Sequence, residues 1–203
     1  MTRDRSRTGT LFVAGLAFAA ALGLAAAPAG AQQASPGVTT LAPAPADPTT
    51  PDEVTLASRP AATLRGQSSW DDGYDVLTST FARLRSEMDK AGIRVTGAPL
   101  AQFLETDDMG FRFEGQLPIE AAPSGRPAGL SADIGFGATP SGRAIRFVHR
   151  APYEEIDSTY EAISAYLDSK GIEAKDVFTE EYVQLGANAG DAALELNIYV
   201  QPK

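Results

Sequence analysis

The sequence predicts an α+β fold in which a strand–helix–strand–strand unit occurs twice with pseudo-two-fold symmetry. We expect one antiparallel sheet with two helices packed on one face. The stretch 145–182 has the pattern of a strand, an amphipathic helix that stops at Gly171, and a second strand. The same pattern occurs 79 residues earlier, where Gly92 occupies the position of Gly171. Strands of alternating polarity follow each helix, so the repeat covers a whole supersecondary unit.

Both predicted helices carry one apolar face. In the second helix, apolar and aromatic residues are separated by steps of three and four, which is the spacing of a single helical face: Tyr153, Ile156, Tyr160, Ile163 and Leu167. Shifting by 79 residues gives five apolar or aromatic positions again: Tyr74, Leu77, Phe81, Leu84 and Met88. A fixed offset that preserves a helix face and its glycine stop indicates an internal duplication.

The predicted strands complete the two halves, 54–120 and 131–203. A Pro-, Gly- and Ser-rich connector at 121–129 separates the halves. In the first half we expect strands within 54–67, 100–106 and 111–119. In the second half we expect strands at 144–148, 177–185 and 194–200, with 134–138 beginning the pairing of this second half.

The N-terminal part of the chain predicts export. Residues 1–31 have three arginines, an Ala-rich apolar stretch and the A-x-A sequence Ala29-Gly30-Ala31, which is typical of a secretory signal peptide cleaved after Ala31. An uncleaved anchor helix is the alternative, but the apolar run is short for a span of about 20 residues. We therefore expect a periplasmic or secreted protein with no stable membrane anchor after cleavage. Residues 32–51 are rich in Pro and Ala and predict a disordered linker, which leaves 52–203 as the folded domain.

Charge and cysteine content restrict the partners. The chain has 17 Lys and Arg, 26 Asp and Glu, and a formal net charge of −9; without residues 1–31 the balance is 14 to 25, or −11. A negative field opposes nucleic acid and favours cationic ligands, although solubility alone also explains it. The absence of cysteine excludes disulfides and thiolate metal sites.

The strongest candidate for a site residue is Glu180. Phe178 and Tyr182 flank it on the same side of its strand, whereas Glu181 points to the other face and serves as an internal control. We expect the ligand on the concave sheet face opposite the helices. Trp70, outside the apolar helix face, is a candidate wall; Tyr74 and Tyr153 are either walls or core residues.

Neither a catalytic motif nor a metal-binding set is evident. His149 is the single histidine, so no zinc ligand set is available, and we expect no metal and no cofactor. The chain contains no nucleophile elbow, metalloprotease helix, phosphate loop or dinucleotide fingerprint.

Residues from about 54 to 203 resemble the GyrI-like (gyrase-inhibitor-like) effector-binding domain, a module of some bacterial regulators that also occurs alone, and the resemblance is clearest from Ile145 on. The resemblance is carried by FVHRAPYEEIDSTYEAISAYLDSKGI, by TEEYV and by the closing LELNIYV strand. Such domains bind small organic molecules, often lipophilic cations, between their halves, and a glutamate two residues before a tyrosine meets the positive charge. Here these residues are Glu180 and Tyr182. Ala151 replaces the glycine that often precedes the Pro-Tyr pair.

The resemblance implies a small-molecule-binding protein, and the signal peptide, which departs from the family's regulators, predicts an exported, stand-alone form. The expected ligand-binding residues, from the resemblance and the pattern together, are Glu180, Tyr182, Phe178, Trp70, Tyr153 and Phe103. Two alternatives stay open: a hydrolase of reactive small molecules that uses Glu180 and Tyr182, and a cell-envelope interaction protein. A haem-binding, SOUL-like family shares this kind of fold, but a haem ligand would have to be His149. No nucleic-acid partner is expected, because the regulators' DNA-binding part has no counterpart in the sequence.

Overall fold

The computed structural model describes residues 39–203, and the predicted signal peptide lies outside the described residues. Two long helices, one short 3-10 helix and eight strands make up this part of the chain. In order they are β1 (Asp52–Leu56), β2 (Pro60–Ser69), α1 (Gly73–Lys90), β3 (Leu100–Asp107), β4 (Gly110–Pro118), β5 (Gly135–Ala138), β6 (Gly142–His149), η1 (Tyr153–Glu155), α2 (Ile156–Lys170), β7 (Ala174–Gln184) and β8 (Glu195–Pro202). The predicted α+β class and both strand–helix–strand–strand units are confirmed.

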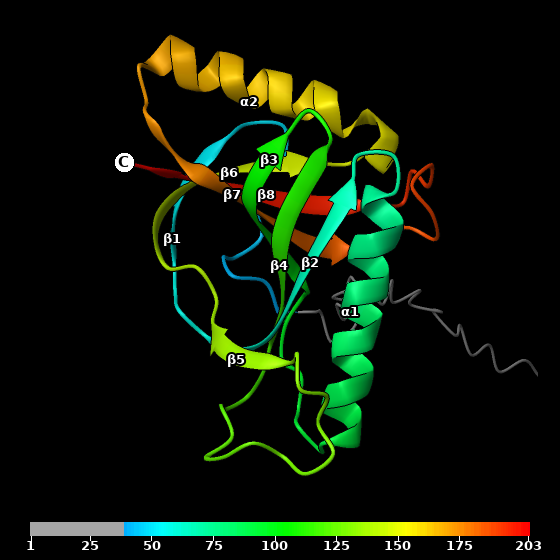
Figure 1. The fold of residues 1–203 in the computed structure, drawn as a ribbon. Coiled ribbons are helices and arrows are strands. Elements are labelled where there is room, and N and C mark those ends of the chain that lie inside the picture. Colours follow the sequence, from blue (N-terminus) through cyan, green and yellow to red (C-terminus); the bar gives the residue numbers. More distant parts are fainter. Residues whose placement is uncertain (1–38) are drawn as a thin grey trace, which may run out of the picture. The chain divides into compact units, whose positions relative to one another are not determined.

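The strands of residues 39–203 form a single antiparallel sheet with the order β1-β6-β8-β7-β3-β4-β2-β5 (Figure 1). The first half contributes β3, β4 and β2, and the second half contributes β7, β8 and β6, each counted outward from the centre. The order is therefore the same on both sides of the β3–β7 junction, which is the arrangement that pseudo-two-fold symmetry requires.

The register at the junction agrees with the 79-residue offset. Ala101 pairs with Glu180, its own equivalent in the other half, so the pseudo-dyad passes through this pair. Each half also has a β-bulge at the equivalent place, after Phe103 in β3 and after Tyr182 in β7. The two halves thus correspond strand by strand, and their origin by duplication stays a prediction.

The glycine stops of both helices are confirmed. Gly92 and Gly171 have φ values of +66° and +62°, the left-handed region that glycine adopts without steric cost. After each glycine, the next backbone N–H donates to the carbonyl four residues before the glycine, at 2.9 and 3.0 Å. This Schellman-type closure ends both helices at the same point relative to the strand that follows.

The helices α1 and α2 cover the same face of the sheet and share one apolar core with it (Figure 1). In α1 all five residues of the predicted apolar face are buried. Of the apolar face predicted for the second helix, only Ile163 and Leu167 in α2 are buried, while Ile156 and Tyr160 at the start of α2 and Tyr153 in η1 are partly exposed. The N-terminal part of α2 therefore leaves space between itself and the sheet.

The two outermost strands are exchanged between the halves. The strand β1 precedes β2 in the first half but pairs with β6 of the second. The strand β5 precedes β6 but pairs with β2 of the first half, so the expectation that 134–138 starts the pairing of the second half is wrong. Each exchanged strand covers an edge that would otherwise expose unpaired N–H and C=O groups.

Residues 39–43, which we call the strap, pack on the sheet face opposite the helices. Leu41 and Ala42 are 4% and 3% exposed. They belong to an apolar cluster with Leu56, Leu100, Ala144 and Tyr199. The expectation that all of 32–51 is a disordered linker is therefore wrong for 39–43, because one leucine and a set of long-range hydrogen bonds hold this Pro- and Ala-rich segment in place.

Within residues 39–203, neither helix is long and apolar enough to span a bilayer.

Candidate functional site

A cavity of about 700 Å³ lies between the sheet and the N-terminal ends of both helices. Its walls come from both halves: α1 with β3 and β4 on one side, and α2 with β7 on the other. Seven of its lining residues are aromatic: Trp70, Tyr74, Phe103, Phe111, Tyr153, Tyr160 and Phe178. The partly exposed start of α2 and the junction between the halves together produce this aromatic space.

The cavity lies on the helix side of the sheet, so the expectation of a site on the opposite face is wrong. Ala101 and Tyr182, which neighbour Glu180 on its side of the sheet, belong to the core that both helices cover. The opposite face is occupied by the strap and its apolar cluster. Since side chains alternate along β7, Glu180 projects toward the helices and Glu181 toward the strap.

Glu180 lies on the floor of the cavity and is fully buried. Its carboxylate accepts three hydrogen bonds from tyrosine hydroxyls. Tyr160 donates to Oε1 at 2.8 Å, Tyr182 donates to Oε2 at 2.6 Å, and Tyr153 donates to Oε2 at 3.4 Å. All three donors are uncharged, so the hydroxyls satisfy the oxygens of the carboxylate without neutralising its charge.

Burial dominates the electrostatics of this cluster. Desolvation raises the pKa of Glu180, and the hydrogen bonds from the three tyrosines lower it only in part. Desolvation and the nearby carboxylate raise the pKa of each of the three tyrosines well above the usual value, so they remain protonated donors. In residues 39–203 no Lys, Arg or His pairs with Glu180, and none lines the cavity.

Three more carboxylates line the cavity near its opening. Asp71 precedes α1, and Glu154 and Asp157 lie in the first turns of η1 and α2. Helix N-termini carry partial positive charge, which acidic side chains offset. Because both helices begin at the cavity, these acids keep its entrance negative as well as its floor.

Comparison with known proteins identifies the family. The family model described as "GyrI-like small molecule binding domain" matches residues 49–203. The chain belongs to this family. No curated protein matches the chain by sequence.

Solved structures share the fold of this GyrI-like domain at low sequence identity. The EcmrR C-terminal domain is 14% identical with a TM-score of 0.63, and the match covers 76% of this chain and 97% of that one. In the cryo-EM structure of an EcmrR–DNA complex, identity is 15% and the TM-score is 0.62; the match covers 76% of this chain and only 57% of the EcmrR chain. A hydrolase from Listeria innocua is 13% identical with a TM-score of 0.53, with coverage of 76% and 92%.

Five of the six residues predicted to bind ligand line the cavity of the GyrI-like domain: Glu180, Phe178, Trp70, Tyr153 and Phe103. The sixth, Tyr182, is buried below the floor, where its ring packs on Phe81 at a centroid distance of 4.9 Å and its hydroxyl holds Glu180. Tyr182 therefore positions the carboxylate and does not line the cavity. Trp70 is half exposed and packs on Phe111 at 5.1 Å.

Sequence reasoning missed several lining residues. Tyr160 belongs to the apolar helix face, which predicts a core residue. In the structure its hydroxyl donates to Glu180, and its ring contacts that of Phe178 edge-on at a centroid distance of 5.8 Å. The alternation of its strand predicts an ordinary core position for Phe111, which lines the cavity. Asp157 is exposed, as the helical pattern predicts, but it also lines the cavity. Only the position of α2 relative to the sheet reveals these roles.

Glu181 points to the opposite face, as the alternation predicted, but it cannot serve as the internal control. It is fully buried on the opposite face. Its Oε1 accepts the N–H of Leu41 at 2.6 Å, and its Oε2 accepts Asn197 Nδ2 at 2.9 Å and the Tyr199 hydroxyl at 2.7 Å. Burial raises the pKa of Glu181, and these hydrogen bonds lower it in part. A substitution here would disturb the strap, so it cannot serve as a neutral comparison for Glu180.

His149 supports the start of α2. It is buried; its Nδ1 lies 2.8 Å from the Thr159 hydroxyl, and its Nε2 donates to the Pro152 carbonyl at 3.2 Å. Both ring nitrogens thus hold the segment that carries Tyr153. Among residues 39–203 no group of three or more His, Cys, Asp or Glu could hold a metal ion.

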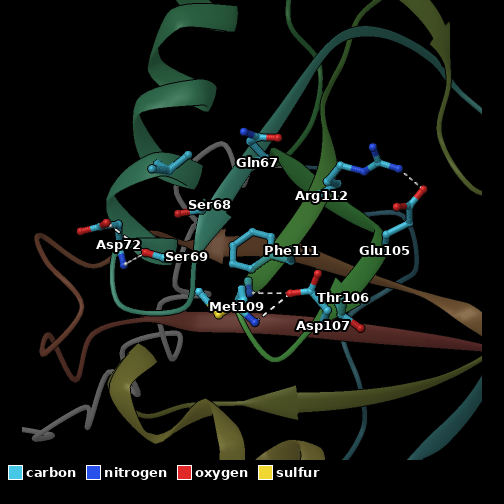
Figure 2. Close-up of a pocket in the computed structure, with 12 residues that line it drawn as sticks. Gln67, Ser68, Ser69, Asp72, Glu105, Thr106, Asp107, Met109, Phe111 and Arg112 are labelled. Carbon is cyan, nitrogen blue, oxygen red and sulfur yellow. Dashed lines mark hydrogen bonds and ion pairs between the residues drawn. The ribbon is translucent and has the colours of Figure 1, made fainter.

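A second cavity, also of about 700 Å³, shares Thr106 and Phe111 with the first (Figure 2). Its four charged side chains are paired within its own walls, whereas the buried Ser68 hydroxyl has no hydrogen-bond partner among the described residues. Asp107 accepts the N–H groups of Met109 and Gly110 at 2.8 and 3.0 Å, Arg112 pairs with Glu105, and Ser69 donates to Asp72 at 3.0 Å (Figure 2). These pairs stabilise the β3–β4 turn and the start of α1, and none of them leaves a buried charge unneutralised. The first cavity is therefore the candidate site.

Proposed function

We propose that this GyrI-like domain binds lipophilic organic cations in the cavity between its halves, with Glu180 as the charge partner, and that it acts as an exported protein. The observation that carries the proposal is the combination of a fully buried carboxylate with a cavity that contains aromatic rings and no basic side chain. Small-molecule binding itself is the property that names the family.

A bound cation would supply the positive charge that the described residues do not place next to Glu180. An ionised carboxylate that loses its hydration is costly unless a positive charge compensates it. Three tyrosine hydroxyls offset part of this cost. The positive centre of a ligand would offset the rest, and aromatic faces would add about 0.5–2 kcal/mol of cation–π attraction per well-placed ring.

An anionic ligand is disfavoured by the same residues. Glu180 on the floor and Asp71, Glu154 and Asp157 near the opening would repel it, and no described basic residue lines the cavity to balance them. The aromatic walls select for apolar bulk and not for a small hydrated ion. The expected ligand is therefore an organic cation with aromatic or aliphatic substituents.

Export is supported by the N-terminal sequence, with its three arginines, apolar stretch and A-x-A site. A ligand-binding domain of this kind outside the cytoplasm would sequester or deliver amphiphilic cations. The formal charge of −11 without residues 1–31 supports the absence of a nucleic-acid partner.

The hydrolase alternative has less support. Both oxygens of Glu180 already accept tyrosine hydroxyls, and the described lining includes no Ser, Cys or His nucleophile. A general base needs access to the proton that it removes. Turnover of a reactive ligand that is lost in Glu180→Gln while binding is kept would reverse this preference.

The test compares two probes of the same shape and opposite charge, tetraphenylphosphonium and tetraphenylborate, by calorimetry on the protein that begins at Gln32. We expect saturable binding of the cation and none of the anion. Equal affinity for both probes, or binding of the borate alone, would refute the role of Glu180. Triphenylphosphine oxide, which is uncharged, separates the contribution of the aromatic walls from that of charge.

A further inference from the structure

We propose that the strap, residues 39–43, holds the two halves at the separation that the ligand cavity requires, so that it positions the binding site from the opposite face of the sheet. The inference rests on the proposed function, because cavity width matters only if the cavity binds a ligand. It assigns a role in binding to residues that touch neither the cavity nor Glu180.

The strap crosses the junction between the halves. At its start, Thr39 forms a parallel bridge with Gly97, and its carbonyl accepts the N–H of Ala98 at 3.2 Å, both in the first half. Leu41 then donates its N–H to Glu181 in the second half at 2.6 Å.

The far end of the strap is also tied to the second half. The Pro43 carbonyl accepts the guanidinium of Arg146, which is 2% exposed and pairs with Asp52. The strap therefore connects the start of β3 to β7 and then to β6, across the pseudo-dyad.

The strand pairing at the junction is short, although Leu100 of the first half shares the apolar cluster with Ala144 and Tyr199 of the second. The strands β3 and β7 pair over only four residue pairs, from Leu100–Glu181 to Phe103–Phe178. A sheet joined over so short a length can twist about that line. The strap lies on one face of the joint, and the cavity lies on the other.

The connection from the strap to the ligand cavity runs through two adjacent residues of β7. Glu181 meets the strap and Glu180 meets the cavity, and both are on the central, paired part of β7. On the cavity side of the sheet, the Tyr74 and Tyr153 rings from opposite halves pack against each other with centroids 5.1 Å apart, and the Tyr74 hydroxyl donates to the Gly186 carbonyl at 2.8 Å. Release of the strap would free the halves to rotate and would loosen this contact in the cavity wall.

The strap also satisfies a buried charge. Leu41 is one of three donors to Glu181, and Arg59 approaches the same place by donating to the Thr40 carbonyl at 2.8 Å. The Leu41 side chain is buried in the apolar cluster with Leu56, Leu100 and Ala144. A carboxylate at position 41 would place an unpaired charge among these residues, on the face that also holds Glu181, so Leu41→Asp should displace the strap.

The experiment measures tetraphenylphosphonium affinity in Leu41→Asp and in Ala44→Asp. Ala44 is exposed and lies one residue beyond the strap, so the second variant adds the same charge without touching Glu181. We expect Kd to rise about tenfold in Leu41→Asp, a coupling within the range found between distant sites, and by less than about twofold in Ala44→Asp. Measurements are made well below the melting temperature of each variant.

A second readout does not depend on the ligand. Because the chain has no cysteine, spin labels can be placed at Asp71→Cys and Asp157→Cys on opposite sides of the cavity entrance. Electron–electron distance measurements should show a longer and broader distribution when Leu41→Asp is added, and no change with Ala44→Asp.

The outcomes separate the two proposals. If the native chain does not bind the phosphonium, the proposed function fails, and the label distances alone decide whether the strap sets the width. A lower melting temperature in Leu41→Asp with unchanged Kd and unchanged label distances would show that the strap only stabilises the fold, and the inference would be overturned.

Discussion

Replacing Glu180 with glutamine should affect folding and binding in opposite directions. Glutamine keeps the shape of the side chain and removes the buried negative charge. Its amide can still accept from Tyr160 and donate to a tyrosine oxygen. Because the charge has no cationic partner among the described residues, we expect the ligand-free variant to be at least as stable as the native domain.

The loss of binding can be worked out from the burial of the site. For a cation about 5 Å from the carboxylate, Coulomb attraction at an effective dielectric of about 20 is about 3 kcal/mol. Removing it should raise Kd about 100-fold. At a ligand concentration of about 100 times the native Kd, the ligand stabilises the native protein by about 2.7 kcal/mol and the variant by about 0.4 kcal/mol. For a domain of this size, that corresponds to a melting shift of about 5–10 °C in the native protein and about 1 °C in the variant.

The assay is thermal unfolding with and without tetraphenylphosphonium, followed by calorimetric Kd values. Glu161→Gln is the matched control, since Glu161 is an exposed acid on α2 that does not line the cavity. A full phosphonium-induced shift in Glu180→Gln, or the same reduction in Glu161→Gln, would refute the assignment of Glu180 as the charge partner.

The geometry leads to four further predictions. Because burial raises the pKa of Glu180 above 4.5, phosphonium affinity should increase as pH rises above that value, while the contribution of Glu180 to folding stability declines over the same window. Tyr160→Phe, which removes one hydrogen bond to the carboxylate, should move the midpoint of the Kd–pH profile to higher pH, and an unchanged midpoint would contradict the hydrogen-bond assignment. Trp70→Ala should weaken phosphonium binding by about 0.5–2 kcal/mol, and quenching of the single Trp on titration should report binding in the native protein; unchanged Kd would place the cation elsewhere. Hydrogen bonds from the backbone N–H of Ser131, at 3.1 Å, and from Lys90 lower the pKa of Glu87 to about 2, so the stability that Glu87 contributes is complete above pH 4.5 and is lost as pH falls toward 2. Urea unfolding at pH 7 and pH 3 should therefore show a smaller decrease in the free energy of unfolding for Glu87→Gln than for the native domain. Equal decreases would count against this pairing.

The local features of the fold could be predicted from the sequence because their signals are local. The apolar face of each helix and the stops at Gly92 and Gly171 follow from spacing within a few turns and from the need for positive φ. The pseudo-two-fold relation between the halves could be predicted from the single offset of 79 residues. Glu180 was recognisable because two aromatic residues flank it on one side of a strand, and the resemblance to the family added its role.

The remaining features depend on contacts between distant residues. Nothing near Leu41 in the sequence indicates that it meets Glu181, 140 positions away. The exchange of β1 and β5 depends on which sheet edges are left uncovered, which no single segment determines. The side of the sheet that holds the cavity depends on how closely α2 approaches β7, and Tyr160 therefore appeared to be an ordinary core residue.

The exchange of edge strands has a consequence for the order in which the chain can fold. The strand β1 finds its partner in β6, where Asp52 and Arg146 are 94 positions apart, and β6 in turn pairs with β8 near the C-terminus. Closing such long loops costs entropy before any pairing is gained, so acquisition of the native topology should be slow. The strands β2, β3 and β4 of the first half can pair with one another early, but β1 has no partner until β6 is present, so the complete sheet forms only when the C-terminal strands are available.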